Sequence, residues 1–584
     1  MEIEPIGSDA PTAAPVRATY LPRTPAPART QAPLSGQPTE SLGESVEAKP
    51  ELLTRVHFAP PAPAEPEGIP VSQLRPIADE AMTSRGLSTT ISPEAMRQVR
   101  EIGGPAPIEG PGVEDLRHLQ WVSIDNESTR DIDQVAYAED LGEGRTRLLV
   151  GIADVAESVP KGSPLDQQAQ KNTVTVYNPG ATTPMLPEEL STDWTSLGPD
   201  VDRRAIVTEH VVGADGEVES SRMFEAAVRN HAKTDYNAVS AWIEGRAPAP
   251  ANIENQEGMA EQVRLQMEVG KRLGEASERR GALEFVTDRV LTVEKDGRIT
   301  DLVAEKKNLA SEAVANQMIA TNTATAKFLH DRGFPVFQRA VQAPERWDRM
   351  REVAVQEASR LPAGKEMPSE IAVLPEKADP AALGAYLREY RERNPEGANE
   401  VTGMFLKLMG GGDYVVTEPG APMAPHFGQG VAGGETGYVH STAPNRRLPD
   451  VITQRLVKAA LRGEPSPYTS QELQGLAARC NEMESHAKGA ERQVRKAAVA
   501  QYLQTQVGEQ YDAIVTGNSK KGVFVRVTDP PIEGKLVQGI EGADVGDRLQ
   551  VKLLAVDPKR GHIDFGKLGE YPREEPNVPL TLSA

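Results

Sequence analysis

An acidic segment at residues 124–134 constrains the fold of this chain more than any other feature of its sequence. It reads Ile-Asp-Asn-Glu-Ser-Thr-Arg-Asp-Ile-Asp-Gln, and short apolar runs flank it at 121–124 and 135–138. Such runs predict strands, so the acids are expected where two strands meet. Asp131 and Asp133 are two positions apart, which places both side chains on one face of extended backbone, and Asp125 can approach them from the preceding strand end.

Carboxylates gathered in this way have two interpretations. Mg²⁺ and Mn²⁺ prefer carboxylate and water oxygens, so Asp125, Asp131 and Asp133 are candidate metal ligands. The alternative is an acidic surface turn that holds no ion. The residues of the segment leave both interpretations open.

The segment resembles the catalytic signature of the RNase II family of exoribonucleases, whose RNB domain carries the pattern I-D-x5-D-x-D-D. Further stretches resemble that family in the expected order, and together they cover about two thirds of the chain. They are IADV at 152–155, VYNP at 176–179, MLP at 185–187, RGALEF at 280–285, HFG at 426–428, STAPNRRLPD at 441–450 and AER at 490–492.

The resemblance implies a hydrolytic exoribonuclease that degrades single-stranded RNA from its 3′ end to nucleoside 5′-monophosphates. Mg²⁺ is the implied cofactor, with Mn²⁺ as an alternative ion. Asp125, Asp131 and Asp133 match three family aspartates that serve the metals, and Asp133 matches the one on which catalysis depends most. Arg446 matches the arginine that grips the phosphate near the scissile bond, so Asp133 and Arg446 are the expected catalytic residues.

The resemblance also implies RNA-binding side chains besides Arg446. Tyr177 and Phe285 fall near positions where the family stacks aromatic rings on the last bases of the strand, which contributes about 1–3 kcal/mol per base. Tyr236 matches a tyrosine associated with recognising ribose, and Glu491 matches a glutamate that faces the terminal nucleotides. For each aromatic ring, the alternative is a place in the hydrophobic core.

Two positions depart from the family pattern. Gln134 stands where the family has a fourth aspartate, and we count it as a candidate metal ligand through its weaker amide oxygen. Two other outcomes stay open: Asp154 or Glu127 compensates, or a second metal binds weakly. Asn316 stands where the family usually has a glutamate that accompanies the ribose-recognising tyrosine. We favour an active enzyme; the alternative is a catalytically weakened RNA-binding or regulatory protein on the same scaffold.

The length of 584 residues exceeds what one hydrophobic core can organise, and the expected fold is a multidomain α+β protein. The expected parts are a disordered Pro- and Ala-rich tail at 1–66, a small helical domain at 67–114, a mixed α/β RNB catalytic domain at 115–504, an S1-type OB-fold β-barrel at 505–570 and a tail at 571–584.

The prediction of a helical domain rests on apolar residues at helical spacing and on Ser92-Pro93-Glu94, a typical helix start. Two roles are open for this domain: it is a helix-turn-helix that contacts nucleic acid, or it only packs on the next domain. It is too short for the OB-folds that family members commonly carry ahead of the catalytic domain. The barrel is similar to the S1 RNA-binding domain, and its cations and aromatic residues suit single strands, although Phe565 by itself is better placed in a core.

Composition limits the remaining classes of protein. The net charge of -21 argues against a polyanionic partner at long range, but a basic channel can coexist with an acidic exterior. The single cysteine, Cys480, excludes a disulfide framework and a thiolate metal site. There is no membrane-length apolar run, signal segment or coiled coil, so we expect a cytoplasmic monomer that contacts no membrane.

Overall fold

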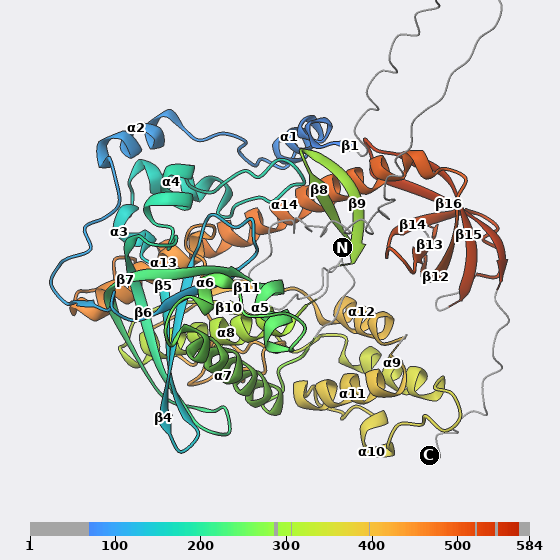
Figure 1. Cartoon of the computed structure of the whole chain (residues 1–584). Coiled ribbons are helices and arrows are strands. Elements are labelled where there is room, and N and C mark those ends of the chain that lie inside the picture. The colour runs from blue at the N-terminus through green and yellow to red at the C-terminus, as the bar shows by residue number, and fades with distance from the viewer. Residues whose placement is uncertain are drawn as a thin grey trace, which may run out of the picture.

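The computed structural model describes residues 69–284, 290–304, 307–395, 397–519, 522–543 and 547–570. The predicted α+β multidomain fold is confirmed: a mixed sheet with helices forms the larger part, and a closed five-stranded barrel ends the described chain (Figure 1). The two predicted tails, 1–66 and 571–584, lie outside the described residues.

A six-stranded sheet organises the larger part, in the order β2-β7-β3-β4-β5-β6. Strand β7 pairs with β2 and β3 in parallel and with β6 in antiparallel fashion, so β3 to β7 close into a ring. The strands are β2 (Val113–Asp115), β3 (Trp121–Asp125), β4 (Gln134–Gly142), β5 (Arg145–Ala153), β6 (Asp202–Val212) and β7 (Val218–Asp235).

Hydrophobic clusters cover both faces of this sheet. Successive residues of β5 alternate between them, as strand geometry requires: Leu148 and Val150 join one cluster, and Leu149 joins the other. The first cluster contains residues of α5 (Tyr236–Ile243), α6 (Ala251–Glu254), α7 (Met259–Arg279) and α8 (Leu309–Asp331). The second contains residues of α3 (Val155–Ser158), α4 (Pro164–Asn172), the π-turn Leu190–Trp194 and α13 (Leu448–Arg462).

One further group of helices, a pair of strands and a long helix complete the larger part. A separate hydrophobic cluster unites α9 (Trp347–Ser359), α10 (Ser369–Ala372), α11 (Pro380–Arg393) and α12 (Ala398–Met409), while β10 (Val336–Ala340) pairs with β11 (Asp413–Thr417). The long helix α14 (Ser470–Tyr502) then runs from this part toward the barrel, to which the short 3₁₀ turn Leu503–Gln506 connects it (Figure 1).

The amino-terminal helices α1 (Arg75–Thr83) and α2 (Pro93–Ile102) pack in different places. The Ser92 side chain caps α2 as predicted, by accepting a hydrogen bond from the Ala95 amide. Residues of α1 share a hydrophobic cluster with α14, whereas Ala95 and Val99 of α2 belong to the main cluster beside α4. Before α1 come the 3₁₀ turn Val71–Gln73 and β1 (Ile69–Pro70), which pairs with the hairpin of β8 (Val290–Lys295) and β9 (Arg298–Ala304).

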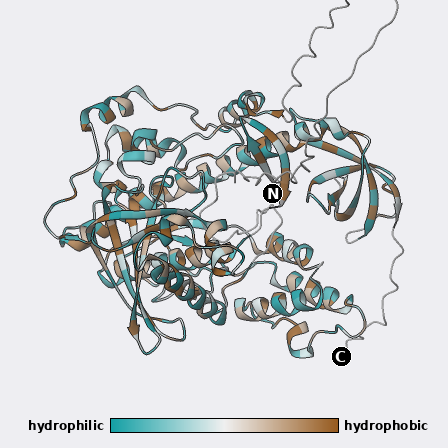
Figure 2. Ribbon diagram, viewed as in Figure 1, coloured by the Kyte–Doolittle hydropathy of each residue, from teal (hydrophilic) through white to brown (hydrophobic). Residues whose placement is uncertain are grey.

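The carboxyl-terminal barrel closes in the order β12-β13-β14-β16-β15. Hydrophobic and hydrophilic residues alternate along its strands (Figure 2). Phe565 is 1% exposed and lies in the barrel core as expected, whereas Phe524 is 36% exposed. The strands are β12 (Gln510–Ser519), β13 (Gly522–Val527), β14 (Glu533–Gln538), β15 (Arg548–Asp557) and β16 (His562–Glu570).

The helices of the described residues were compared with what a membrane span requires. None of them combines the length and the apolar character needed to cross a bilayer.

Candidate active site

The acidic segment connects two strands, as predicted. Strand β3 ends at Asp125, β4 begins at Gln134, and both strands are central in the sheet. Asp125 and Asp133 are 6% and 2% exposed, so this is no surface turn of solvated acids. Buried carboxylates require partners, and these partners define the site.

Asp133 is held by the loop that precedes α13. Its Oδ1 accepts a hydrogen bond of 2.9 Å from the Asn445 amide, and its Oδ2 accepts one of 3.1 Å from Arg446 Nε. Burial raises the pKa of Asp133 to about 7, although the Arg446 guanidinium opposes that shift. The fold thus joins the two expected catalytic residues, which are more than three hundred positions apart in the sequence.

Asp131 lies beside Tyr177. The Tyr177 hydroxyl donates to Asp131 Oδ2 at 3.2 Å, and the Tyr177 backbone amide donates to Glu491 Oε1 at 2.8 Å. Burial raises the pKa of Asp131, with the Arg446 charge acting in the opposite direction. Two of the expected RNA-binding residues therefore adjoin the acidic segment.

Asp125 is satisfied by donors close in the sequence. Its Oδ1 accepts from the Asn126 amide at 2.7 Å and from the Thr129 hydroxyl at 3.0 Å, and its Oδ2 accepts from Gln134 Nε2 at 3.3 Å. Tyr236, the first residue of α5, is 8% exposed. Asp235 pairs with Asp125 in the register of β7 with β3, so the next residue, Tyr236, lies at the same site. Burial and the nearby Asp125 charge raise the pKa of Tyr236.

Other predicted residues lie elsewhere. Phe285 lies outside the described residues. Glu127 is exposed, and Asn316 donates to the Gly270 carbonyl at 3.1 Å, where it joins α8 to α7. The Asp154 carboxylate forms an ion pair with Lys458 and accepts from the Glu157 amide, so its oxygens are engaged away from Gln134.

Asp154, Glu157 and Glu225 form a second acidic group. Their ligand atoms lie within 4.8 Å of one another, a spacing that could hold a metal ion; among the described residues, the three aspartates of the acidic segment are not gathered so closely. Lys458 Nζ, however, contacts all three acids, at 2.7 Å from Glu157 and 3.2 Å from Glu225. Arg204 and Arg462 pair with the same acids, so three cations balance three anions. We interpret this group as a buried salt-bridge network.

The acidic segment differs from that network in its charge balance. Within the part of the chain that the structure describes, the buried Asp125 and Asp133 and the partly buried Asp131 lie beside one guanidinium, that of Arg446, whose side chain is 11% exposed. An excess of buried negative charge is stabilised by a cation, and hard oxygen donors suit Mg²⁺ or Mn²⁺. The residues at this site therefore fit a divalent metal ion.

Sequence reasoning assigned no role to several residues that shape the site. Asp450 is fully buried and accepts from the Ala443 amide at 2.8 Å and from Arg447 Nε at 2.9 Å, which closes the loop that carries Arg446. Asn445 reaches Thr195 with its side chain at 2.5 Å. The signal for Asp450 was its place in the first turn of α13, next to a helix start with Pro449.

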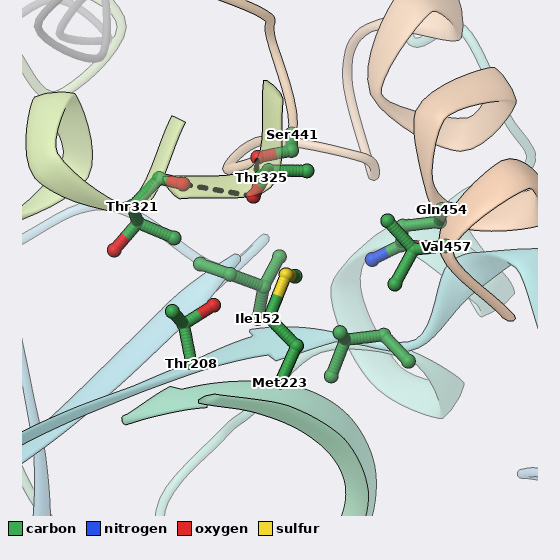
Figure 3. Close-up of a pocket in the computed structure, with 9 residues that line it drawn as sticks. Ile152, Thr208, Met223, Thr321, Thr325, Ser441, Gln454 and Val457 are labelled. Carbon is green, nitrogen blue, oxygen red and sulfur yellow. Dashed lines mark hydrogen bonds between the residues drawn. The ribbon is translucent and has the colours of Figure 1, made fainter. Parts of the chain in front are cut away.

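A small cavity of about 10 Å³ lies elsewhere, between the sheet, α8 and α13, and has room for about one water molecule (Figure 3). The Thr321 and Thr325 hydroxyls beside it donate to main-chain carbonyls, and Ser441 bonds to Asn322 and Thr325. It is therefore no binding site for a nucleotide. Its lining residues are Ile152, Ile206, Thr208, Met223, Thr321, Thr325, Ser441, Gln454 and Val457.

Comparison with protein families gives two matches. Residues 113–463 match the model of the RNB domain, and residues 509–568 match that of the RNase II-type exonuclease C-terminal S1 domain. The first match covers the acidic segment, Tyr177, Tyr236 and Arg446, and the second covers the barrel.

Curated relatives include a ribonuclease R and an exoribonuclease 2. The chain is 28% identical to ribonuclease R of Vibrio parahaemolyticus over 511 residues, which are 81% of this chain and 58% of that protein. It is 32% identical to exoribonuclease 2 of Erwinia tasmaniensis over 425 residues, which are 71% of this chain and 61% of that protein. The chain thus spans about three fifths of the length of these relatives.

Solved structures share the fold. Mycoplasma genitalium RNase R in complex with ribose methylated single-stranded RNA superposes with a TM-score of 0.73 at 19% identity, over 84% of this chain and 77% of that one. Yeast Ssd1, described as a pseudonuclease, gives 0.58 at 14% identity, over 83% and 58% of the two chains. At these identities, the likeness establishes the architecture.

Proposed function

This chain belongs to the RNase II family of exoribonucleases, and from that premise we propose that it hydrolyses single-stranded RNA from the 3′ end. The proposed products are nucleoside 5′-monophosphates. The main support for the proposal is one set of contacts: Arg446 contacts Asp133, and Tyr177 contacts the neighbouring Asp131. A cation that can bind phosphate, carboxylates that can bind metal and an aromatic ring therefore lie together.

Asp131 and Asp133 are the residues proposed to hold Mg²⁺ or Mn²⁺, with Asp125 beside them. When bound, the metal supplies activation of a water molecule and stabilisation of the leaving oxygen. Burial supports this role, because a dry site strengthens each electrostatic contact to the reacting phosphate.

The other side chains bind and orient the RNA end. The Arg446 guanidinium lies beside the carboxylates, where its planar set of N–H donors is suited to a phosphate oxygen. Tyr177 offers a ring for stacking on a terminal base, and Glu491 fixes the backbone that carries this ring. Tyr236 is proposed to contact the ribose, and the barrel with its exposed Phe524 is proposed to bind the strand farther from its 3′ end.

A direct test uses 5′-labelled single-stranded RNA and DNA of the same sequence, with Mg²⁺ or with a chelator. We expect an RNA ladder that shortens from the 3′ end and disappears with chelator. Asp133→Asn is expected to abolish the ladder, because the side chain keeps its size but loses its charge, and circular dichroism checks that the variant is folded.

Asp348→Asn is the matched control, because that aspartate side chain is 90% exposed on α9 and far in sequence from the site. It should leave the ladder unchanged. Tight RNA binding without shortening in the unmodified protein would instead identify a non-catalytic RNA-binding protein, and equal shortening of RNA and DNA would identify a nuclease without sugar preference.

A further inference from the structure

We propose that the acidic segment binds one divalent ion before RNA arrives, and that Gln134 acts as a hydrogen-bond partner of Asp125 instead of a ligand to a second ion. This inference rests on the proposed function, because it concerns the metal site of the same reaction.

The contact between Gln134 and Asp125 fixes how the amide is oriented. Gln134 Nε2 lies 3.3 Å from Asp125 Oδ2. An ionised carboxylate can only accept hydrogen bonds, so the end of the amide that faces it must be the NH₂ group. Among the described residues, no group donates a hydrogen bond to Gln134 Oε1 although the residue is only 4% exposed, so this oxygen is a neutral acceptor for a water molecule.

An aspartate at position 134 would create a different electrostatic problem. Two carboxylates would then face each other at the junction of β3 and β4, and like charges this close in a buried place need a cation or a proton between them. The Gln134 amide meets Asp125 without either. The glutamine therefore removes the reason for a second cation at Asp125.

The geometry of the carboxylates supports the same count. Asp125 accepts from three protein donors, whereas Asp133 accepts from two and Asp131 accepts from the Tyr177 hydroxyl. The three carboxylates are not all within 4.8 Å of one another, so we expect the ion at Asp131 and Asp133, which accept fewer hydrogen bonds.

The test counts bound Mn²⁺ without measuring activity. The full chain is titrated with Mn²⁺ in the absence of RNA, and the electron paramagnetic resonance signal of free Mn²⁺ gives the ions left in solution. We expect one tight ion per chain. Gln134→Asp is expected to add a second ion, with affinity raised by about tenfold or more over any second ion of the unmodified chain.

Gln167→Glu is the matched control, because it adds a carboxylate at an exposed position of α4. It should leave the count at one. Two tight ions in the unmodified chain, or the same count in Gln134→Asp, would overturn the inference while leaving the proposed function intact. No tight ion in either form, together with RNA shortening that chelator does not affect, would contradict the metal-assisted function itself.

Discussion

Asp133 and Arg446 make the contact on which the proposed chemistry depends most. The Arg446 side chain is 11% exposed and that of Asp133 is 2% exposed, so their pairing takes place largely out of water. A pair this deeply buried is sensitive to geometry as well as to charge, because a donor that is lost leaves an unsatisfied carboxylate.

Arg446→Lys tests the geometry of this contact at constant charge. A lysine ammonium cannot replace Nε toward Asp133 and also present a planar fork to a phosphate. We expect kcat/KM on single-stranded RNA to fall by about 100-fold, which corresponds to about 2.7 kcal/mol. Arg349→Lys, at a half-exposed site on α9, serves as the control, and equal kcat/KM in both variants would contradict the role of Arg446.

The sequence predicted the local positions of the site residues but not their contacts with residues distant in the chain. Asp125 and Gln134 were expected at strand ends because short apolar runs define strands locally, and the structure places them there. The contact of Asp133 with the Asn445 amide could not be derived in that way, because it depends on how a loop more than three hundred positions away folds. The ion pair of Asp154 with Lys458 could not be predicted for the same reason, because the two residues are distant in the sequence.

At the scale of elements, the loop before α13 and the first turn of that helix form one unit. Asp450 joins the Ala443 amide to the Arg447 side chain and so holds the intervening residues in place. Because these residues deliver both donors to Asp133, the unit positions the site without touching the substrate.

Asp450→Asn is expected to destabilise this unit. The variant leaves the buried Arg447 guanidinium without its counter-ion, and a broken buried pair costs about 3–5 kcal/mol. Calorimetry should show a lower melting temperature for the large domain, and kcat should fall more than KM changes. A melting temperature equal to that of Asp348→Asn would show that Asp450 has no such role.

Strand β6 gives a pH-dependent prediction. His210 is fully buried between Ser221 of β7 and Thr321 of α8, and burial lowers its pKa to about 4. A histidine in the unfolded chain has a pKa near 6.5, so below that pH the unfolded state binds a proton that the folded state does not bind. Stability is therefore lost as pH falls from 6.5 toward 4.

The size of this loss is about 3 kcal/mol, from the two pKa values. His210→Gln keeps polar groups near both hydroxyls and carries no titrating ring. Its denaturant unfolding, compared with that of the unmodified chain from pH 7 to pH 4.5, should show a shallower decline. Parallel declines in the two proteins would rule out His210 as the cause.

For the whole molecule, the arrangement of the amino-terminal segment was beyond sequence reasoning. The helix start at Ser92 and the existence of the barrel follow from local patterns, and both are found. The separate partners of α1 and α2 follow from tertiary packing, since helical spacing gives an apolar face but no information on what covers it.

That arrangement bears on access to the site. The segment from β1 to α2 lies along α14, the β8–β9 hairpin and α4, and it is too short to include an OB-fold. We expect RNA hairpins with short and long 3′ overhangs both to be digested close to the stem. The fragments can be sized on a sequencing gel, and a stop many nucleotides before the stem would show an entrance that excludes structured RNA.

The proposed reaction is hydrolysis of RNA from the 3′ end at Asp133 and Arg446. The most direct measurement is mass spectrometry of the nucleotides released in water enriched in heavy oxygen. We predict nucleoside 5′-monophosphates that carry one heavy oxygen from the solvent, and none from Asp133→Asn. Nucleoside diphosphates, 3′-monophosphates or products unaffected by Asp133→Asn would contradict this reaction.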